Sequence, residues 1–185
     1  MRLIFLCLLA LFSCGPLLRC EDENILKESF HISKIPRSYS AKLSLREGIL
    51  SVPLELRKSQ DNILLRAQGR EVRLDSQSFC LGLVCFAMPM SIDGLIFAKV
   101  LDGTERVSCS HGQTVFRGAE GAFEKIVIFE GKRPKIVRML NEKGEEYLRV
   151  DYLNWVQGRA GAMRLKFAGR DAVIVIEGLD VSGSL

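Results

Sequence analysis

The chain has 185 residues, 48% of them hydrophobic, and a formal net charge of +4 at neutral pH. This length is enough for one domain with a full hydrophobic core. The small positive surplus is spread along the sequence without the basic blocks that bind nucleic acid, so nucleic acid is not an expected partner.

The first residues have the pattern of an export signal. Arg2 precedes an unbroken apolar run over residues 3–12, which is too short to cross a bilayer because a spanning helix needs about 20 apolar residues. Ser13-Cys14-Gly15-Pro16 follows at once and cannot continue the helix. The sequence therefore predicts a protein that works outside the cytoplasm.

The end of this signal resembles the lipobox of bacterial lipoproteins, in which the signal is cut before a cysteine that carries diacylglycerol. The matching residues are Leu11-Phe12-Ser13-Cys14. We expect a signal peptide over residues 1–13 and a lipid anchor on Cys14. An ordinary cleaved signal, cut after Cys20, is the main alternative. By analogy with Gram-negative lipoprotein sorting, Gly15 favours the outer membrane, with the body facing the periplasm.

Residues 14–185 are expected to form a single domain with four cysteines besides Cys14. Three complete pairings are possible and the sequence does not choose among them, so two disulfides, one disulfide or free thiols all remain open. The spacing is not that of a zinc site and only two histidines are present, so no metal is expected. The four cysteines are Cys20, Cys80, Cys85 and Cys109.

The body opens with a helical pattern and then changes to the alternation of β-strands. Residues 21–32 predict a helix that begins with three acids and ends before Pro36. Residues 39–46 and 50–57 alternate apolar and polar side chains around a turn at Glu47-Gly48, which predicts a hairpin. Strands over residues 63–68 and 72–75 follow.

The middle of the chain is the most apolar part. Residues 79–90 are almost wholly hydrophobic and predict a strand buried on both faces. Ser91 can cap a helix over residues 92–101, closed by Asp102-Gly103. Because that helix is apolar around more than half its circumference, we expect it to lie against the concave side of a sheet.

The second half predicts a series of short strands joined by tight turns. About ten strands with one central helix make an antiparallel sheet that must curl on itself. The fold class is therefore mainly β, with a few helices. The strands are expected at residues 104–109, 113–117, 123–130, 135–141, 146–153, 163–168 and 172–178.

No catalytic signature accompanies this pattern. Glycine-rich phosphate loops, HExxH and GxSxG are missing from the sequence, so we expect no enzyme, no catalytic residues and no cofactor. Cys109 and His111 would share one face of a strand, and an enzyme that uses this pair is the alternative. A cysteine in a disulfide or in the core is the more common arrangement.

The order of elements is similar to that of the bacterial Lol lipoprotein-localisation family (the LolA/LolB-like proteins). The similarity covers the helix and hairpin over residues 30–45, the helix between strands over residues 89–103, and the closing run over residues 129–181 with its turn Gly131-Lys132-Arg133-Pro134. It implies a strongly curved, incompletely closed antiparallel barrel with an N-terminal helix and a short helix that plugs the concave face.

The resemblance also implies a function and a site. It predicts a lipid-anchored outer-membrane protein that binds lipoprotein acyl chains or another lipid in a hydrophobic cavity and exchanges cargo with a periplasmic carrier protein. A non-catalytic envelope sensor or assembly module that binds a protein partner is the alternative, and a filled core is the alternative to a cavity. The candidate cavity residues are Leu43, Leu45, Leu54, Leu56, Leu65, Leu74, Ile92, Leu95, Ile96, Ile126, Ile128, Leu148, Val150, Leu165 and Phe167.

Overall fold

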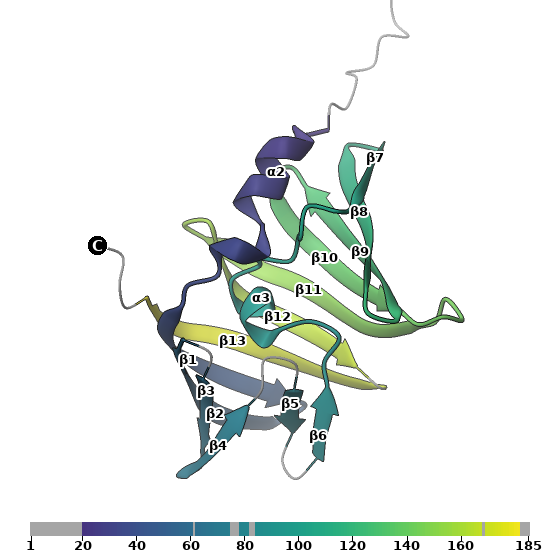
Figure 1. The fold of residues 1–185 in the computed structure, drawn as a ribbon. Helices are drawn as coiled ribbons and strands as arrows, with labels where there is room; N and C mark the ends of the chain where they lie inside the picture. The colour runs from purple at the N-terminus through teal and green to yellow at the C-terminus, as the bar shows by residue number, and fades with distance from the viewer. Residues whose placement is uncertain (1–19, 61, 75–77, 82–83, 168, 182–185) are drawn as a thin grey trace, which may run out of the picture.

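The computed structural model describes residues 20–181, except residues 61, 75–77, 82–83 and 168 (Figure 1). The expected signal peptide and Cys14 lie outside the described residues. Most of the described chain forms one curved antiparallel sheet of eleven strands, which bends around two short helices (Figure 1).

The strands follow the alternation of the sequence. The sheet contains β1 (Ser38–Glu47), β2 (Leu50–Ser59), β3 (Asn62–Ala67), β4 (Arg70–Leu74), β7 (Arg106–Ser110), β8 (Gln113–Glu120), β9 (Phe123–Glu130), β10 (Arg133–Leu140), β11 (Glu146–Val156), β12 (Arg159–Phe167) and β13 (Arg170–Asp180).

The order of strands explains why the barrel stays open. Across the sheet the strands run β4-β3-β2-β1-β13-β12-β11-β10-β9-β8-β7. The last strand therefore pairs with the first, with Ser44 opposite Val175, and joins two antiparallel meanders into one sheet. Strands β4 and β7 form the two edges and do not pair with each other, so the expected incompletely closed, curved barrel is confirmed.

The N-terminal helix is shorter than the sequence pattern suggests. Helix α2 runs from Glu23 to Ser29, and Asp22 caps it by accepting a hydrogen bond from the backbone N–H of Asn24 at 2.8 Å. A 3₁₀ turn, η1 (Ile32–Lys34), follows. The chain from Cys20 to Lys34 is called the strap below.

The expected ten-residue helix after Ser91 was wrong in length. Helix α3 covers only Ile92–Ile96, because Ala98 turns into the left-handed region with φ +54°. The N–H groups of Ala98 and Lys99 donate to the carbonyls of Leu95 (3.1 Å) and Gly94 (2.8 Å), which is a Schellman ending. A side chain on Gly94 would approach the Lys99 carbonyl to 2.9 Å, so this tight ending needs glycine there.

The single strand expected over residues 79–90 was also wrong. This stretch forms two strands, β5 (Ser78–Leu81) and β6 (Val84–Ala87), which pair only with each other in a separate two-stranded sheet. A continuous apolar run does not reveal such a reversal, because it lacks the alternation that marks where one strand ends.

The hydrophobic core lies on the concave side of the large sheet, under α2 and α3. It draws on every strand from β1 to β4 and from β8 to β13. Its members with no exposed surface at all are Leu56, Val100, Leu101, Phe116, Val127, Phe129, Val137, Met139, Leu148 and Val150.

Candidate functional site

The candidate site is the concave face together with the segment that covers it. We call residues 88–105 the plug, since it carries α3 across the inside of the curved sheet (Figure 1). Ile92, Leu95 and Ile96 are each at most 4% exposed, so the apolar face of α3 is packed against the core. The hydroxyl of Tyr152, on β11, donates to the Leu95 carbonyl at 3.0 Å and so ties the helix to the sheet.

Asp93 ties the start of the plug to the first two strands. It lies in the first turn of α3 and is 2% exposed. Its carboxylate accepts hydrogen bonds from the Tyr39 hydroxyl and the Lys58 ammonium group, one on each carboxylate oxygen. Burial, with the negative charge of Asp93 as the next cause, raises the pKa of Tyr39 above its usual range, so this hydroxyl stays a donor.

Lys125 ties the end of the plug to β9. It is 1% exposed, and its ammonium group lies 2.9 Å from Asp102 Oδ2, 2.9 Å from Glu105 Oε1 and 3.0 Å from Glu120 Oε2. Burial alone would lower the pKa of Lys125, but the hydrogen bonds to the three carboxylates outweigh it and raise that pKa. Lys125 therefore remains charged inside the protein.

The carboxylates around Lys125 also shape the plug backbone. Glu105 accepts hydrogen bonds from the backbone N–H groups of Asp102 (2.9 Å) and Gly103 (3.0 Å). Burial would raise the pKa of Asp102, but hydrogen bonds from Thr104 and Lys125 lower it to about 2. The turn that ends the plug is thus held by ionised groups.

The strap holds the plug from outside. The Ile32 N–H donates to the Leu101 carbonyl at 2.8 Å, and the Leu101 N–H donates to the Phe30 carbonyl at 3.1 Å. His31 Nε2 lies 2.9 Å from the carbonyl oxygen of Asp102, and Lys99 donates to the Ser29 carbonyl at 2.5 Å. Plug and strap therefore form one hydrogen-bonded layer over the sheet.

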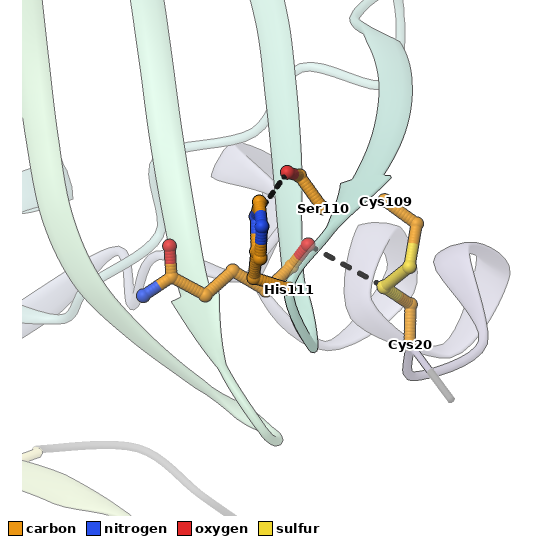
Figure 2. Close-up of a disulfide and its surroundings, with 5 residues drawn as sticks. Cys20, Cys109, Ser110 and His111 are labelled. Carbon is orange, nitrogen blue, oxygen red and sulfur yellow. Dashed lines mark hydrogen bonds between the residues drawn. A yellow bond between two sulfur atoms is a disulfide. The ribbon is translucent and has the colours of Figure 1, made fainter. Parts of the chain in front are cut away.

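A disulfide fastens the start of the strap to the edge of the sheet. Cys20 and Cys109, on β7, are bonded with a Cα–Cα distance of 5.9 Å (Figure 2). The bond links positions 89 residues apart, and Cys109 is exposed. Cys20 Sγ also lies 3.4 Å from the Gln113 carbonyl oxygen. The other two cysteines are partners in backbone register, Cys80 on β5 opposite Cys85 on β6.

This disulfide removes the only nucleophile that the sequence suggested. His111 contacts the Ser110 hydroxyl through Nδ1 at 2.8 Å, in an exposed turn (Figure 2). The sulfur of Cys109 is bonded to Cys20 and does not titrate, so it cannot form the thiolate that a cysteine nucleophile requires. In the part of the chain that the structure describes, no group of three histidine, cysteine or acidic side chains is placed to hold a metal ion.

A cleft of about 600 Å³ opens between the strap and the plug. Its volume lies within the range of small-molecule sites. Burial, with Lys34 as a further cause, lowers the pKa of Lys99 beside this opening. The lining mixes aliphatic and charged side chains: His31, Ile32, Ser33, Ile35, Lys58, Met90, Ser91, Asp93, Gly94, Lys99, Val100 and Glu120.

The fifteen candidate cavity residues lie elsewhere, and none of them lines this cleft. Twelve belong to the buried core cluster and Leu45 packs against it. Ile126 is buried outside that cluster and Ile128 is half-buried, because β9 turns Val127 and Phe129 inward instead. Leu43 and Leu54 also line a second hollow of about 530 Å³ at the β1–β2–β3 face.

Sequence reasoning missed the polar ties. The pattern of the sequence singled out neither Asp93 nor Lys125, and it placed Ile126 and Ile128, which alternate with Lys125 on β9, on the inward face. One signal could have found Lys125. On β9 the alternate positions are Phe123, Lys125, Val127 and Phe129, so a single lysine interrupts an apolar face that contains the larger side chains. A charge in such a series indicates a buried ion pair.

With this geometry, the chain can be compared with known proteins. No family model and no curated protein sequence matches it. Several solved structures share its fold, among them three bacterial proteins. A domain described as belonging to an outer membrane lipoprotein-sorting protein of Vibrio parahaemolyticus has a TM-score of 0.51 at 13% identity and covers 88% of this chain and 90% of its own.

The other two are still more distant in sequence. A LolA superfamily protein from Nitrosomonas europaea has a TM-score of 0.51 at 9% identity, covering 88% of this chain and 94% of its own. A DUF1329 family protein from Desulfovibrio piger has a TM-score of 0.50 at 10% identity, covering 88% and 91%. The chain thus has a LolA-like fold. The resemblance drawn from the sequence is confirmed at the level of the fold.

Because Asp102 is ionised in the folded protein, the free energy of unfolding should decrease at acid pH. Because its pKa is lowered from 3.8 to about 2, its contribution to folding is full above pH 3.8 and is lost as the pH falls towards 2. We expect Asp102→Asn to flatten this part of the curve of unfolding free energy against pH, measured by urea denaturation. Asp171→Asn, at an exposed position, is the control. An unchanged curve for Asp102→Asn would contradict the assignment.

The disulfide should contribute substantially to stability. Closing a loop of this length removes conformational freedom from the unfolded chain that is equivalent to about 4.6 kcal/mol. We expect Cys109→Ala to lower the unfolding free energy by about 2–5 kcal/mol. Reduced wild-type protein should match the variant, and Ser110→Ala should stay near wild type. Equal stability of oxidised wild type and Cys109→Ala would show that the bond is not formed in solution.

Proposed function

We propose that the chain is a lipid-anchored outer-membrane protein that binds acyl chains of lipoproteins, or of another lipid, on the concave face of its sheet. In this proposal it acts in lipoprotein localisation or lipid transfer, and it binds cargo rather than catalysing a reaction. Cargo would come from a periplasmic carrier protein. The anchor would be on Cys14, as the lipobox pattern predicts.

The observation that carries the proposal is how the concave face is covered. A helix of only five residues, α3, shields an aliphatic surface that extends over ten strands. A helix this short has little stability of its own, so its position depends on its packing and on its ties to Tyr39, Lys58 and Tyr152. In this proposal α3 moves away from the sheet when these ties break, while the bonds to the strap and to Lys125 hold the end of the plug.

Exchange of plug for cargo is physically reasonable. An acyl chain that replaces Ile92, Leu95 and Ile96 would bury apolar surface of the same kind, worth about 0.8 kcal/mol per methylene group. The loss of plug packing would therefore be largely offset by chain burial. The cleft between strap and plug, which is lined by both aliphatic and charged side chains, supplies an opening. The shared LolA-like fold supports the same type of ligand.

The anchor can be tested by itself. No helix in the described part of the chain is long and apolar enough to cross a membrane. We expect the mature protein from detergent-extracted membranes to have Cys14 as its first residue, with a mass increase equal to a diacylglycerol. The Cys14→Ser chain should lack this mass and leave the membrane fraction. An unmodified N-terminus at a later residue would exclude the anchor.

Acyl binding can be tested by weakening the plug without leaving a buried charge. Lys58→Met combined with Asp93→Asn removes both charges of one tie. The plug and an acyl chain compete for the same concave face, so a less stable closed plug should favour lipid binding. The variant should therefore bind a synthetic triacylated lipopeptide more tightly, by roughly tenfold for each 1.4 kcal/mol by which the closed conformation is destabilised. Native mass spectrometry and titration with a fluorescent lipopeptide would measure this.

The control for that experiment removes a matched ion pair that lies away from the plug. Arg57→Met with Glu55→Gln eliminates a pair on β2, 2.7 Å apart, whose arginine is exposed. It should bind the lipopeptide like wild type. If neither wild type nor the plug variant forms a complex, acyl binding is wrong. Capture of a protein without lipid by both would favour an assembly module.

A further inference from the structure

The tip of the β1–β2 hairpin exposes two large aliphatic side chains to solvent. Glu47 pairs with Leu50 around a two-residue turn, in which Gly48 adopts φ +58°. Ile49 is 101% exposed and Leu50 is 67% exposed. Turns of this kind usually place polar residues at the tip. Packing within this chain does not account for an isoleucine and a leucine at this place.

The hairpin also extends beyond the strand beside it. Strand β3 ends at Ala67, which pairs with Leu54, so the first four positions of β2, next to the turn, have no partner on that side. At about 3.3 Å per residue the tip extends roughly 13 Å past the end of β3. On the other side β13 begins at Arg170, near the level of the tip. The tip therefore projects past β3 on one side and lies level with the start of β13 on the other.

The charges around the tip are mainly positive. Arg46, Arg70 and Arg170 are exposed, and none of them forms an ion pair within the described residues. The nearby acids Glu71 and Asp171 face Arg66 (3.1 Å) and Arg164 (3.7 Å) instead. Glu47 is the acid that offsets part of this surplus. The free arginines can therefore meet phosphate groups.

We propose that the tip formed by Ile49 and Leu50, with Arg46 and Arg170 beside it, inserts into the surface of a bilayer that contains anionic phospholipids. A projection with two apolar side chains offers far less than the roughly 1,200 Å² that a stable protein interface buries. A bilayer surface, in contrast, deforms around a projecting tip, and its phosphates attract basic side chains. This contact goes beyond acyl binding on the concave face and does not depend on it.

The test places a fluorescent reporter at the tip. In full-length protein with Trp155→Phe, which removes the single native tryptophan, Ile49→Trp makes the tip visible. We expect its emission to shift to the blue on addition of phosphatidylglycerol vesicles and to be quenched by brominated lipid. Val156→Trp in the same background is the control, because Val156 is 63% exposed at the end of β11, away from the tip.

Charge and lipid composition separate the outcomes. With Arg46→Glu and Arg170→Glu together, binding to anionic vesicles, measured by the blue shift from position 49, should weaken by roughly tenfold or more. The signal with phosphatidylcholine vesicles should not change. A water-like emission from position 49 with every vesicle would overturn the proposal. A blue shift without lipid would overturn it too, because the tip would then be covered by protein. The outcome of this vesicle test does not depend on whether the concave face binds the lipopeptide, so the two proposals can fail separately.

Discussion

The structure depends on how one short segment is held across an aliphatic surface. The curved sheet cannot cover its own concave face, because its edges β4 and β7 remain apart. The plug supplies that cover with a helix of five residues, which cannot be stable alone. Its position is set by Asp93 at one end and by Lys125 at the other, two charged groups that are both at most 2% exposed.

Buried ion pairs of this kind fix a geometry more than they add stability. The desolvation of Lys125 and its three carboxylates offsets much of their mutual attraction. A plug held this way is well defined when closed, since a displaced charge would be left unpaired in the core. Such an arrangement is compatible with the proposed exchange of the plug for cargo.

The sequence predicted the parts of this molecule that depend on local pattern. Alternation located the strands because most of them bury one face, and the sequence Glu47-Gly48 predicted the first hairpin, whose turn in the structure is formed by Gly48 and Ile49. It failed where the outcome depends on distant residues. Helix α3 ends at a left-handed Ala98, where no glycine marked the stop. The partner of Cys20 lies 89 residues away, and that pairing follows from the meeting of strap and edge strand.

The candidate site shows the same division. The aliphatic residues of the concave face were predictable, because a period of two assigns them to one side. On β9 the apolar pattern alone did not identify the inward face, because both faces are rich in apolar side chains, and the lone Lys125 was the signal that distinguishes them. That lysine faces inward because Asp102, Glu105 and Glu120 meet there from the plug and from β8. Lys125, which sets the orientation of β9, therefore also holds the plug, so the sheet and the plug depend on the same buried contacts.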